Sequence, residues 1–228
     1  MKKKDLRQER TRQRQEDYKH AILQAAEAVI IRKGYSAATM DDVAREAQFS
    51  KATIYRYLKS KGEMIFEIIL HYFEELELRM REINAMKKSA TEKLREAIRS
   101  VLEFYAEKEN ISHIFMMDEA FMKKMRIFVP GQQKFASALD KKLIKMMRTK
   151  RKEISEVGGE ILQEGVATGE FREMNIQEAV TFLEAVLEGS LHGRFWYGEE
   201  PNLQKETNLI HSFFLYGIEK KTKNEKEN

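Results

Sequence analysis

The chain has 228 residues and a formal net charge of +4, with 42% hydrophobic and 34% charged residues, and this length can bury a substantial core as one compact unit or two small ones. There is no cysteine, which excludes disulfides, thiolate metal ligands and cysteine nucleophiles. Only 2 prolines and 11 glycines interrupt the chain, which favours an all-α fold.

The charges are distributed unevenly. Residues 1–62 contain 15 Lys and Arg against 8 Asp and Glu, whereas the remaining residues contain 26 against 29. A basic segment on a slightly acidic body favours an anionic partner at one end, although charge alone is equally compatible with a solvated N-terminal tail. The basic start lacks the apolar core of a signal peptide, and no apolar run is long enough to span a bilayer. We therefore expect a cytoplasmic protein with no membrane partner.

The chain begins with a polar arm and an amphipathic helix. Residues 1–16 contain almost no apolar side chain, and we expect a basic arm that is either flexible or a frayed extension of the next helix. Apolar residues then recur at helical spacing from Ile22 to Ile30. Gly34 is predicted to end this helix, because glycine favours the left-handed conformation of a C-cap.

Two short helices follow, joined by a tight turn. Thr39 is a predicted N-cap for a helix through Ala47. Ser50 is a predicted N-cap for a second helix from Lys51 to about Leu58.

The rest of the chain is expected to form longer helices. Ser60 and Glu63 give a capping-box signal for the first of them. Apolar periodicity places these helices at about 61–86, 91–108, 111–127, 135–167, 176–196 and 203–218, followed by a polar tail at 220–228. There is no strand signal and no internal repeat, so the predicted fold class is all-α.

The two short helices have the arrangement of a helix-turn-helix, whose second helix enters the major groove of DNA with its N-terminus first. Lys51 and Thr53 lie in the first turn of that helix, where side chains can reach bases or phosphates. Ile54 and Leu58 share one face, which should pack on the preceding helix. These features alone do not decide the function, because short capped helices occur in many helical domains.

A longer pattern surrounds these helices. The segments that carry it are ILQAA at 22–26, KGY at 33–35, TMDDVA at 39–44 and AQFSKATIYRYLKSK at 47–61. In order and spacing, residues 20–65 resemble the DNA-binding domain of the tetracycline-repressor-like (TetR/AcrR) family of transcriptional regulators. The resemblance implies an N-terminal three-helix helix-turn-helix domain at 17–62 and a C-terminal helical ligand-binding and dimerisation domain at 63–219.

The resemblance also implies roles for individual residues. It places the following side chains mainly at the DNA backbone: Thr39, Ser50, Thr53, Tyr55, Tyr57 and Lys61. It places Lys51, Ala52 and Arg56 near the base edges. Small departures from the family pattern occur at Ala38, Phe49, Ala52, Leu58 and Gly62, and none removes a phosphate contact. Of the two tyrosines, we expect Tyr55 to be partly packed and Tyr57 to lie at a phosphate.

A Met- and Phe-rich segment lies between residues 115 and 128. Methionine is flexible and suits adaptable apolar sites, so this segment is either the wall of a pocket for a hydrophobic or amphipathic ligand or a Met-rich core. The candidate pocket residues are Phe104, His113, Met116, Met117, Phe121, Phe182, Val186 and Trp196. Asp118, Glu184 and His192 are polar groups that either orient a ligand or lie at the surface. The five histidines lack metal-ligand spacing, and we expect no metal and no cofactor.

The last two predicted helices carry more apolar surface than one small domain needs, which favours a homodimer with a four-helix interface. The candidate interface residues are Leu183, Leu187, Gly189, Gly193, Ile210, Phe213 and Phe214. The alternative is that both apolar faces pack within one subunit.

These patterns predict a homodimeric DNA-binding regulator that binds a palindromic double-stranded operator. By the habit of the family it is a repressor, released by a small hydrophobic or amphipathic ligand. The alternative is a helical regulator controlled by a protein partner without such a ligand. An enzyme is not expected, because the sequence has no phosphate-cradling glycine loop, nucleophile elbow or metal motif.

Overall fold

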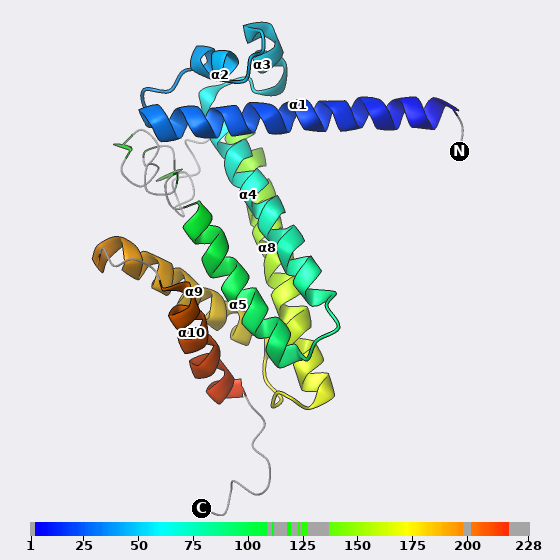
Figure 1. Ribbon diagram of the computed structural model, residues 1–228, viewed down its shortest axis with the longest axis vertical. Coiled ribbons are helices and arrows are strands. Elements are labelled where there is room, and N and C mark those ends of the chain that lie inside the picture. The colour runs from blue at the N-terminus through cyan, green and yellow to red at the C-terminus, as the bar shows by residue number, and fades with distance from the viewer. Residues whose placement is uncertain are drawn as a thin grey trace, which may run out of the picture. The chain divides into compact units, whose positions relative to one another are not determined.

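The computed structural model of the chain describes residues 3–108, 111, 118, 119, 123, 125, 126, 137–197 and 202–218, with side chains for all of these except 3–8, 139, 191–197 and 218. The helices are α1 (Lys3–Lys33), α2 (Met40–Glu46), α3 (Lys51–Tyr57), α4 (Lys61–Asn84), α5 (Ala90–Glu107), α8 (Ala138–Thr168), α9 (Ile176–Tyr197) and α10 (Leu203–Ile218) (Figure 1). The fold is all-α, as predicted, with an N-terminal helix-turn-helix and a C-terminal helical domain. None of the described helices is long and apolar enough to cross a membrane.

Backbone contacts divide the chain into two compact units. The head unit comprises residues 1–71 and 109–146, and the body unit comprises residues 72–108 and 147–228. We expected a boundary at residue 62, at the start of the helix predicted at about 61–86. The division instead falls inside α4, whose first part belongs to the head unit and whose second part belongs to the body unit.

The head unit is organised along α1. Ile22, Ala26, Val29 and Ile30 are fully buried on the side of α1 against which α2 packs. The helix ends where predicted, because Gly34 takes the left-handed backbone conformation with φ +79°. Figure 1 shows α2 and α3 along one side of the C-terminal half of α1.

The predicted basic arm is helical. Residues 3–16 continue α1 toward its N-terminus, which corresponds to the second of the two expected forms. The side chains described there are exposed, and Arg12 pairs with Glu16 one turn later at 3.0 Å. The arm therefore presents its charges to solvent along the N-terminal part of a long helix.

The body unit is built around one apolar core. The core residues are Leu76, Met80 and Ile83 of α4; Ala90, Leu94, Ala97, Ile98, Leu102 and Phe104 of α5; Val157, Ile161 and Leu162 of α8; Phe171; Val180 and Leu187 of α9; and Ile210 and Phe214 of α10. The α5 helix packs against both α9 and α10.

Local signals explain where the body helices begin and end. Ser89 and Glu92 form a reciprocal capping box that starts α5, one residue before the predicted start. The α8 helix ends before Gly169, which again has φ +79°. The chain then folds back so that Phe171 covers Gly165, where an added Cβ would overlap the ring. The helix expected at 111–127 lies largely outside the described residues.

Candidate nucleic-acid interface

The first helix of the helix-turn-helix is fixed by a reciprocal cap. Thr39 is the N-cap of α2, and its Oγ1 accepts a hydrogen bond from the backbone N–H of Asp42. In return, the Thr39 hydroxyl and backbone N–H donate to the Asp42 carboxylate at 2.7 and 3.2 Å. This arrangement satisfies amide groups that would otherwise lack partners at the start of a helix.

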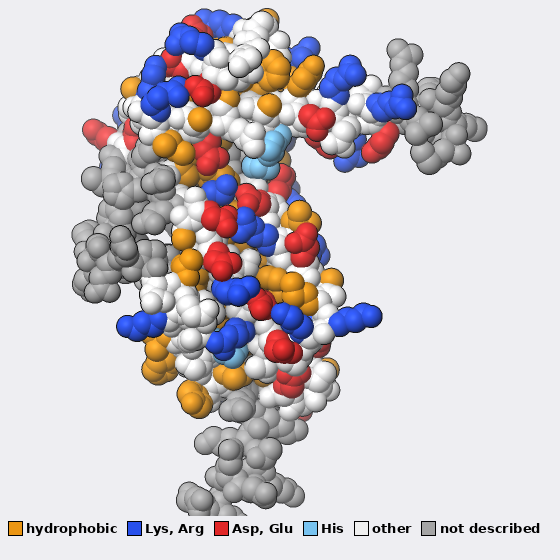
Figure 2. Space-filling model, viewed as in Figure 1, with side chains coloured by type: hydrophobic (Ala, Val, Ile, Leu, Met, Phe, Trp, Pro, Cys, Tyr) orange, Lys and Arg blue, Asp and Glu red, His pale blue; other side chains and the backbone are white. Residues whose placement is uncertain are grey.

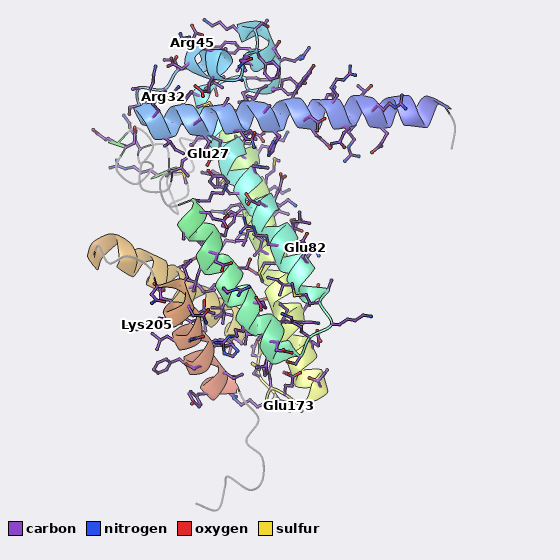
Figure 3. All side chains as sticks on the ribbon, in the orientation of Figure 1. Glu27, Arg32, Arg45, Glu82, Glu173 and Lys205 are labelled. Atoms are coloured by element: carbon purple, nitrogen blue, oxygen red, sulfur yellow. The ribbon has the colours of Figure 1, made fainter. Side chains whose placement is uncertain are left out.

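Asp42 also joins α2 to α1. Its Oδ1 accepts a hydrogen bond from the Lys33 ammonium at 2.7 Å. The bonds from Lys33 and Thr39 lower the pKa of Asp42 to about 2. A second ion pair, between Arg32 and Glu46 at 2.7 Å, links the same two helices. Figure 3 labels Arg32 near the end of α1, and it labels Arg45, the neighbour of Glu46 in sequence, on α2.

The turn between the two short helices depends on one residue with an unusual backbone. Gln48 has φ 55°, in the left-handed region that residues with a Cβ rarely adopt. The conformation reverses the chain so that the Phe49 N–H reaches the Ala44 carbonyl at 3.0 Å. The turn thereby sets the angle between α2 and α3.

The second helix has one buried face and one exposed face. Ser50 caps α3 by accepting the Thr53 N–H at 3.1 Å, as predicted. Ile54 in α3 and Leu58 just after it are fully buried. The exposed residues of the short helix are Lys51, Ala52, Tyr55 and Arg56. The apolar face anchors the helix while its N-terminal turn and polar face remain available to a partner.

Lys51 has an acidic partner that the sequence pattern did not predict. Its ammonium forms an ion pair with Asp41 of α2 at 2.7 Å, and both side chains are more than half exposed. The hydrogen bond and the charge of Asp41 raise the pKa of Lys51. Lys51 is therefore cationic and held near the start of α2, in a pair that a phosphate can replace at small cost because exposed ion pairs are weak.

The two tyrosines differ from the expected arrangement. Tyr55 is 43% exposed, whereas Tyr57 is half-buried. The Tyr57 ring lies edge-on to Tyr18 of α1, with ring centroids 6.4 Å apart, and Tyr18 also contacts Phe49 edge-on at 5.2 Å. Tyr57 is thus the more packed of the two, the reverse of our expectation, because it joins an aromatic cluster contributed by α1 and the turn.

Lys61 is also more enclosed than expected. Its ammonium donates to the Ser36 carbonyl at 2.8 Å and lies 4.5 Å from the centre of the Tyr35 ring. Partial burial lowers the pKa of Lys61. In this arrangement Lys61 supports the loop between α1 and α2. The same loop is held by Asp118, whose carboxylate accepts the Ser36 N–H at 2.6 Å and the Ser36 hydroxyl at 2.8 Å.

The head unit has a predominantly cationic outer surface. Figure 2 shows Lys and Arg side chains along α2 and α3 with fewer Asp and Glu side chains between them, while both signs alternate over the body helices. The exposed cations of α3 and the segment after it are Lys51, Arg56 and Lys59. A cationic surface around a helix N-terminus suits a polyanion.

The predicted pocket residues are only partly within the described structure. His113, Met116, Met117 and Phe121 lie outside it, as does the side chain of Trp196. Phe104 is buried in the core of the body unit, and Val186 packs against that core. Phe182 is 63% exposed on α9, so in one subunit its ring does not line an interior space.

The predicted interface residues fall into two groups. Leu183, Leu187, Ile210 and Phe214 pack in or against the core of their own subunit, which is the alternative that the sequence left open for them. Phe213 is 72% exposed and Gly189 is exposed, whereas the surroundings of Gly193 are not described. Three further apolar side chains are exposed on α9 and α10, namely Phe182, Leu209 and Tyr216.

The class of this protein is that of helix-turn-helix DNA-binding regulators. Three features define it: two capped short helices, the tight turn between them and a cationic exposed face. Residues 22–68 match the sequence profile of the bacterial regulatory proteins of the tetR family. The N-terminal part of the chain therefore carries a DNA-binding domain of the tetR-family type.

Relatives and solved structures agree with this assignment. The chain is 25% identical over 204 residues to the uncharacterized HTH-type transcriptional regulator YhgD of Bacillus subtilis, covering 89% of this chain and 97% of YhgD. It is 28% identical over 152 residues to the HTH-type transcriptional repressor KstR2 of Mycolicibacterium smegmatis, covering 66% of each. The fold is similar to that of the regulator FadR from Bacillus subtilis in complex with stearoyl-CoA, with a TM-score of 0.65, 20% identity and coverage of 87% and 98% of the two chains.

Proposed function

We propose that this protein is a homodimeric transcriptional repressor that binds a palindromic operator and is released by a small hydrophobic or amphipathic ligand. The observation that carries the DNA-binding part is α3, with its Ser50-capped N-terminus, its buried anchor at Ile54 and its exposed cations. A helix held in this way can enter a major groove end-on without exposing apolar surface.

The DNA contacts follow from the exposure of each side chain. Lys51, Ala52 and Arg56 are exposed at or near the start of α3 and are proposed to lie at the base edges. Exposed Thr39, Ser50 and Tyr55, together with the half-buried Thr53, Tyr57 and Lys61, are proposed to contact the sugar-phosphate backbone. For Lys61, this contact requires its ammonium to turn away from the Ser36 carbonyl.

The proposed dimer uses the exposed apolar side chains of α9 and α10. Leu209, Phe213 and Tyr216 recur at a spacing of three or four residues on α10, and Phe182 lies beside them, stacked on Phe214 with ring centroids 6.4 Å apart. Such a contiguous apolar surface is typical of an interface. Two-fold symmetry then presents two copies of α3 to two half-sites, which is the reason for a palindromic operator.

Release by a ligand follows from linkage. A ligand that binds one arrangement of the two heads more tightly than another shifts the population toward that arrangement. The free-energy difference between the two arrangements changes by the difference between the ligand's binding free energies for them. A difference of about 5.5 kcal/mol moves an equilibrium from 1:99 to 99:1. The similarity to a repressor, KstR2, and to FadR in complex with stearoyl-CoA supports repression and a hydrophobic or amphipathic ligand.

The test is a mobility-shift titration of the purified protein on the DNA upstream of its own gene, repeated at several salt concentrations. We expect specific binding that the double variant Lys51→Ala, Tyr57→Phe loses. Lys87→Ala, which removes an exposed cation of the body unit between α4 and α5, is the matched control and should bind normally. A folded dimer without sequence-specific binding to any upstream fragment would contradict the proposal.

A further inference from the structure

The two aspartates in the first turn of α2 hold different partners. Asp42 is buried, and its carboxylate binds Thr39 and Lys33, so it fixes α2 to its own N-cap and to α1. Asp41 is exposed, and its carboxylate binds the ammonium of Lys51 at the start of α3. An exposed ion pair adds little to stability. Asp42 therefore carries the structural role, which leaves the Asp41 carboxylate at the surface that α3 presents to DNA.

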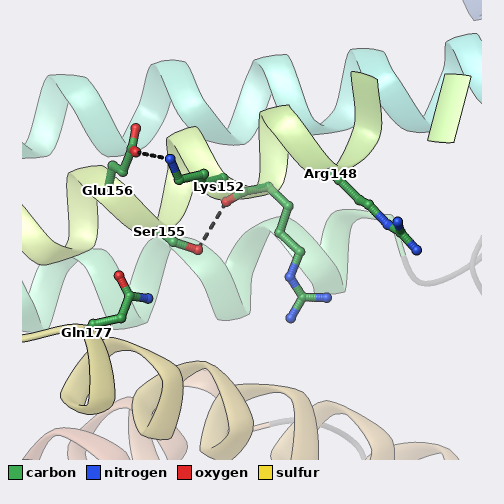
Figure 4. Close-up of a pocket in the computed structure, with 6 residues that line it drawn as sticks. Arg148, Lys152, Ser155, Glu156 and Gln177 are labelled. Carbon is green, nitrogen blue, oxygen red and sulfur yellow. Dashed lines mark hydrogen bonds and ion pairs between the residues drawn. The ribbon is translucent and has the colours of Figure 1, made fainter. Parts of the chain in front are cut away.

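An ion pair in the body unit illustrates an ordinary surface pair. Lys152 and Glu156 of α8 pair at 3.1 Å beside a surface hollow of about 410 Å³ (Figure 4). They lie four residues apart on one helix, the spacing at which side chains of any exposed helix meet. Asp41 and Lys51 lie ten residues apart on two helices. Their pairing depends on the turn at Gln48, so the fold of the helix-turn-helix brings this cation and this carboxylate together.

Both groups of the Asp41–Lys51 pair can bind a further partner. The Lys51 nitrogen lies 2.7 Å from one Asp41 oxygen and 2.8 Å from the other. An ammonium has three N–H donors and a carboxylate has about four acceptor positions, so each keeps capacity beyond the bond that joins them. Both side chains are more than half exposed, and Ala52 adds only a methyl group beside Lys51. The pair thus presents donors and acceptors side by side.

The spacing of the pair matches the major-groove edge of a G·C base pair. Guanine presents the acceptors N7 and O6 there, and cytosine presents the N4 donor. A hydrogen bond joins guanine O6 to cytosine N4, so these atoms lie about 2.9 Å apart. The Lys51 nitrogen and the nearer Asp41 oxygen are 2.7 Å apart. An ammonium over O6 and N7 and a carboxylate beside N4 can therefore bind both bases of one pair while remaining paired with each other.

The other three base pairs match this arrangement less well. A T·A pair gives the ammonium a single acceptor, O4, next to a methyl group, and it places the N7 acceptor of adenine near the carboxylate. The C·G and A·T pairs place a donor nearest the ammonium and an acceptor nearest the carboxylate, so both contacts are repulsive. A carboxylate close to DNA also repels phosphates, which weakens binding to any sequence that offers it no donor.

We propose that Asp41 is a specificity-determining residue and that, together with Lys51, it reads one G·C pair in each half-site of the operator. Lys51 donates to guanine O6 and N7, and Asp41 accepts from cytosine N4. The carboxylate adds discrimination that a lysine alone lacks, because a lysine also donates to thymine O4. This role of Asp41 rests on the proposed function, since it requires the binding of an operator.

The first test selects duplexes from a random library with the full-length protein. Mobility shifts then give the affinity for the enriched sequence and for its single-base-pair variants. At one position of each half-site, we expect G·C to bind about ten-fold or more tightly than C·G, with T·A between them. Asp41→Ala should remove most of the preference for G·C over T·A at that position. The same variant should bind random-sequence DNA more tightly than the wild type, because a repulsive charge is gone.

Asp41→Asn tests for a change of specificity, which a structural role would not produce. An asparagine amide donates as well as accepts, and it pairs with N6 and N7 of adenine. We therefore expect Asp41→Asn to move the preferred base pair at this position from G·C to T·A, with circular dichroism showing that the variant is folded. An unchanged preference for G·C in both Asp41 variants, or an equal loss of affinity for all four base pairs, would overturn the proposal.

Glu156→Ala is the matched control, because it removes the carboxylate of the Lys152 pair and changes the net charge by the same amount. It should leave the order of preferred base pairs unchanged. A loss of preference in Glu156→Ala equal to that in Asp41→Ala would assign the effect to net charge and defeat the proposal. A wild-type protein that enriches no sequence would contradict the proposed function as well, whereas an enriched operator in which no position responds to Asp41 would contradict the role of Asp41 alone.

Discussion

The carboxylate of Asp42 connects three parts of the head unit. It accepts hydrogen bonds from the N-cap residue Thr39 and from Lys33 at the end of α1, and Arg45 lies 3.4 Å away. Because these partners favour the ionised form, the pKa of Asp42 falls to about 2. Its ionisation therefore stabilises the position of α2 against α1.

Asp42→Asn should lower the thermal midpoint of the protein by several degrees at neutral pH. The folded-state pKa lies below the ordinary value of 3.8, so this stabilisation is present above about pH 4 and is lost as the pH falls toward about 2. Thermal unfolding of both proteins between pH 7 and pH 2 should show the two midpoints converging in that window. Asp41→Asn, which removes only an exposed pair, should have a smaller effect; an equal effect would contradict the special role of Asp42.

Gln48 offers a second test at the scale of one residue. In the left-handed conformation, a residue with a Cβ has a higher backbone free energy than glycine in the folded state. Glycine, however, loses more conformational entropy when the chain folds. With φ 55° at Gln48, we expect Gln48→Gly to raise the free energy of unfolding by about 0.5–1 kcal/mol. Urea unfolding followed by circular dichroism measures the change. Gln48→Ala keeps the Cβ and should give no gain, so a gain with alanine would point to another cause.

At the scale of the element, the sequence predicted helices well wherever the signal is local. Thr39 and Ser50 cap the short helices as expected, and Gly34 and Gly169 end α1 and α8 with positive φ. Caps and glycine stops act through the backbone of their own turn, so they can be recognised without knowing the fold.

The interactions that could not be predicted join residues far apart in the chain. The aromatic cluster of Tyr18, Phe49 and Tyr57 depends on the angle at which α1 crosses α3, and this angle is not encoded in any short segment. The bond from Ser36 to Asp118 spans 82 residues. Our expectation that Tyr55 is the more packed of the two tyrosines was wrong for the same reason. Helical periodicity gives the face on which a residue lies but not which residues lie opposite that face.

The arm is the element whose function can be tested most directly. Residues 3–16 extend α1 as an exposed helix, and Arg10 and Arg14 lie one turn apart on it. If the arm neutralises phosphates, deleting residues 2–14 should reduce the slope of log affinity against log salt by about 0.9 for each phosphate that the arm had neutralised. Mobility shifts at four or more salt concentrations give the slope.

The arm prediction has a variant that preserves chain length. Arg10→Ala combined with Arg14→Ala should reproduce part of the change, whereas Lys87→Ala combined with Lys88→Ala removes two exposed cations of the body unit and should not. An unchanged slope after the deletion would show that the arm does not bind DNA.

At the scale of the whole molecule, two helix-turn-helix heads are needed to read a palindrome, so assembly and DNA binding are linked. Phe182 of α9 and Phe213 and Phe214 of α10 line part of a shallow hollow of about 330 Å³. Phe213 is 72% exposed in one subunit, which is unfavourable for a large aromatic ring unless a partner covers it.

Phe213→Glu should therefore convert the protein to a folded monomer, because the new carboxylate would be buried without a partner in the dimer but solvated in the monomer. Sedimentation at micromolar concentration measures the state of assembly. Leu78→Glu, at a 59% exposed apolar residue on α4, is the matched control and should remain dimeric.

A monomeric variant with one head per molecule should also lose most of its affinity for a two-half-site operator while keeping its weak, salt-sensitive binding to DNA of any sequence. A Phe213→Glu protein that sediments as a dimer would place the interface on another surface and leave the exposed face of α10 for a different partner.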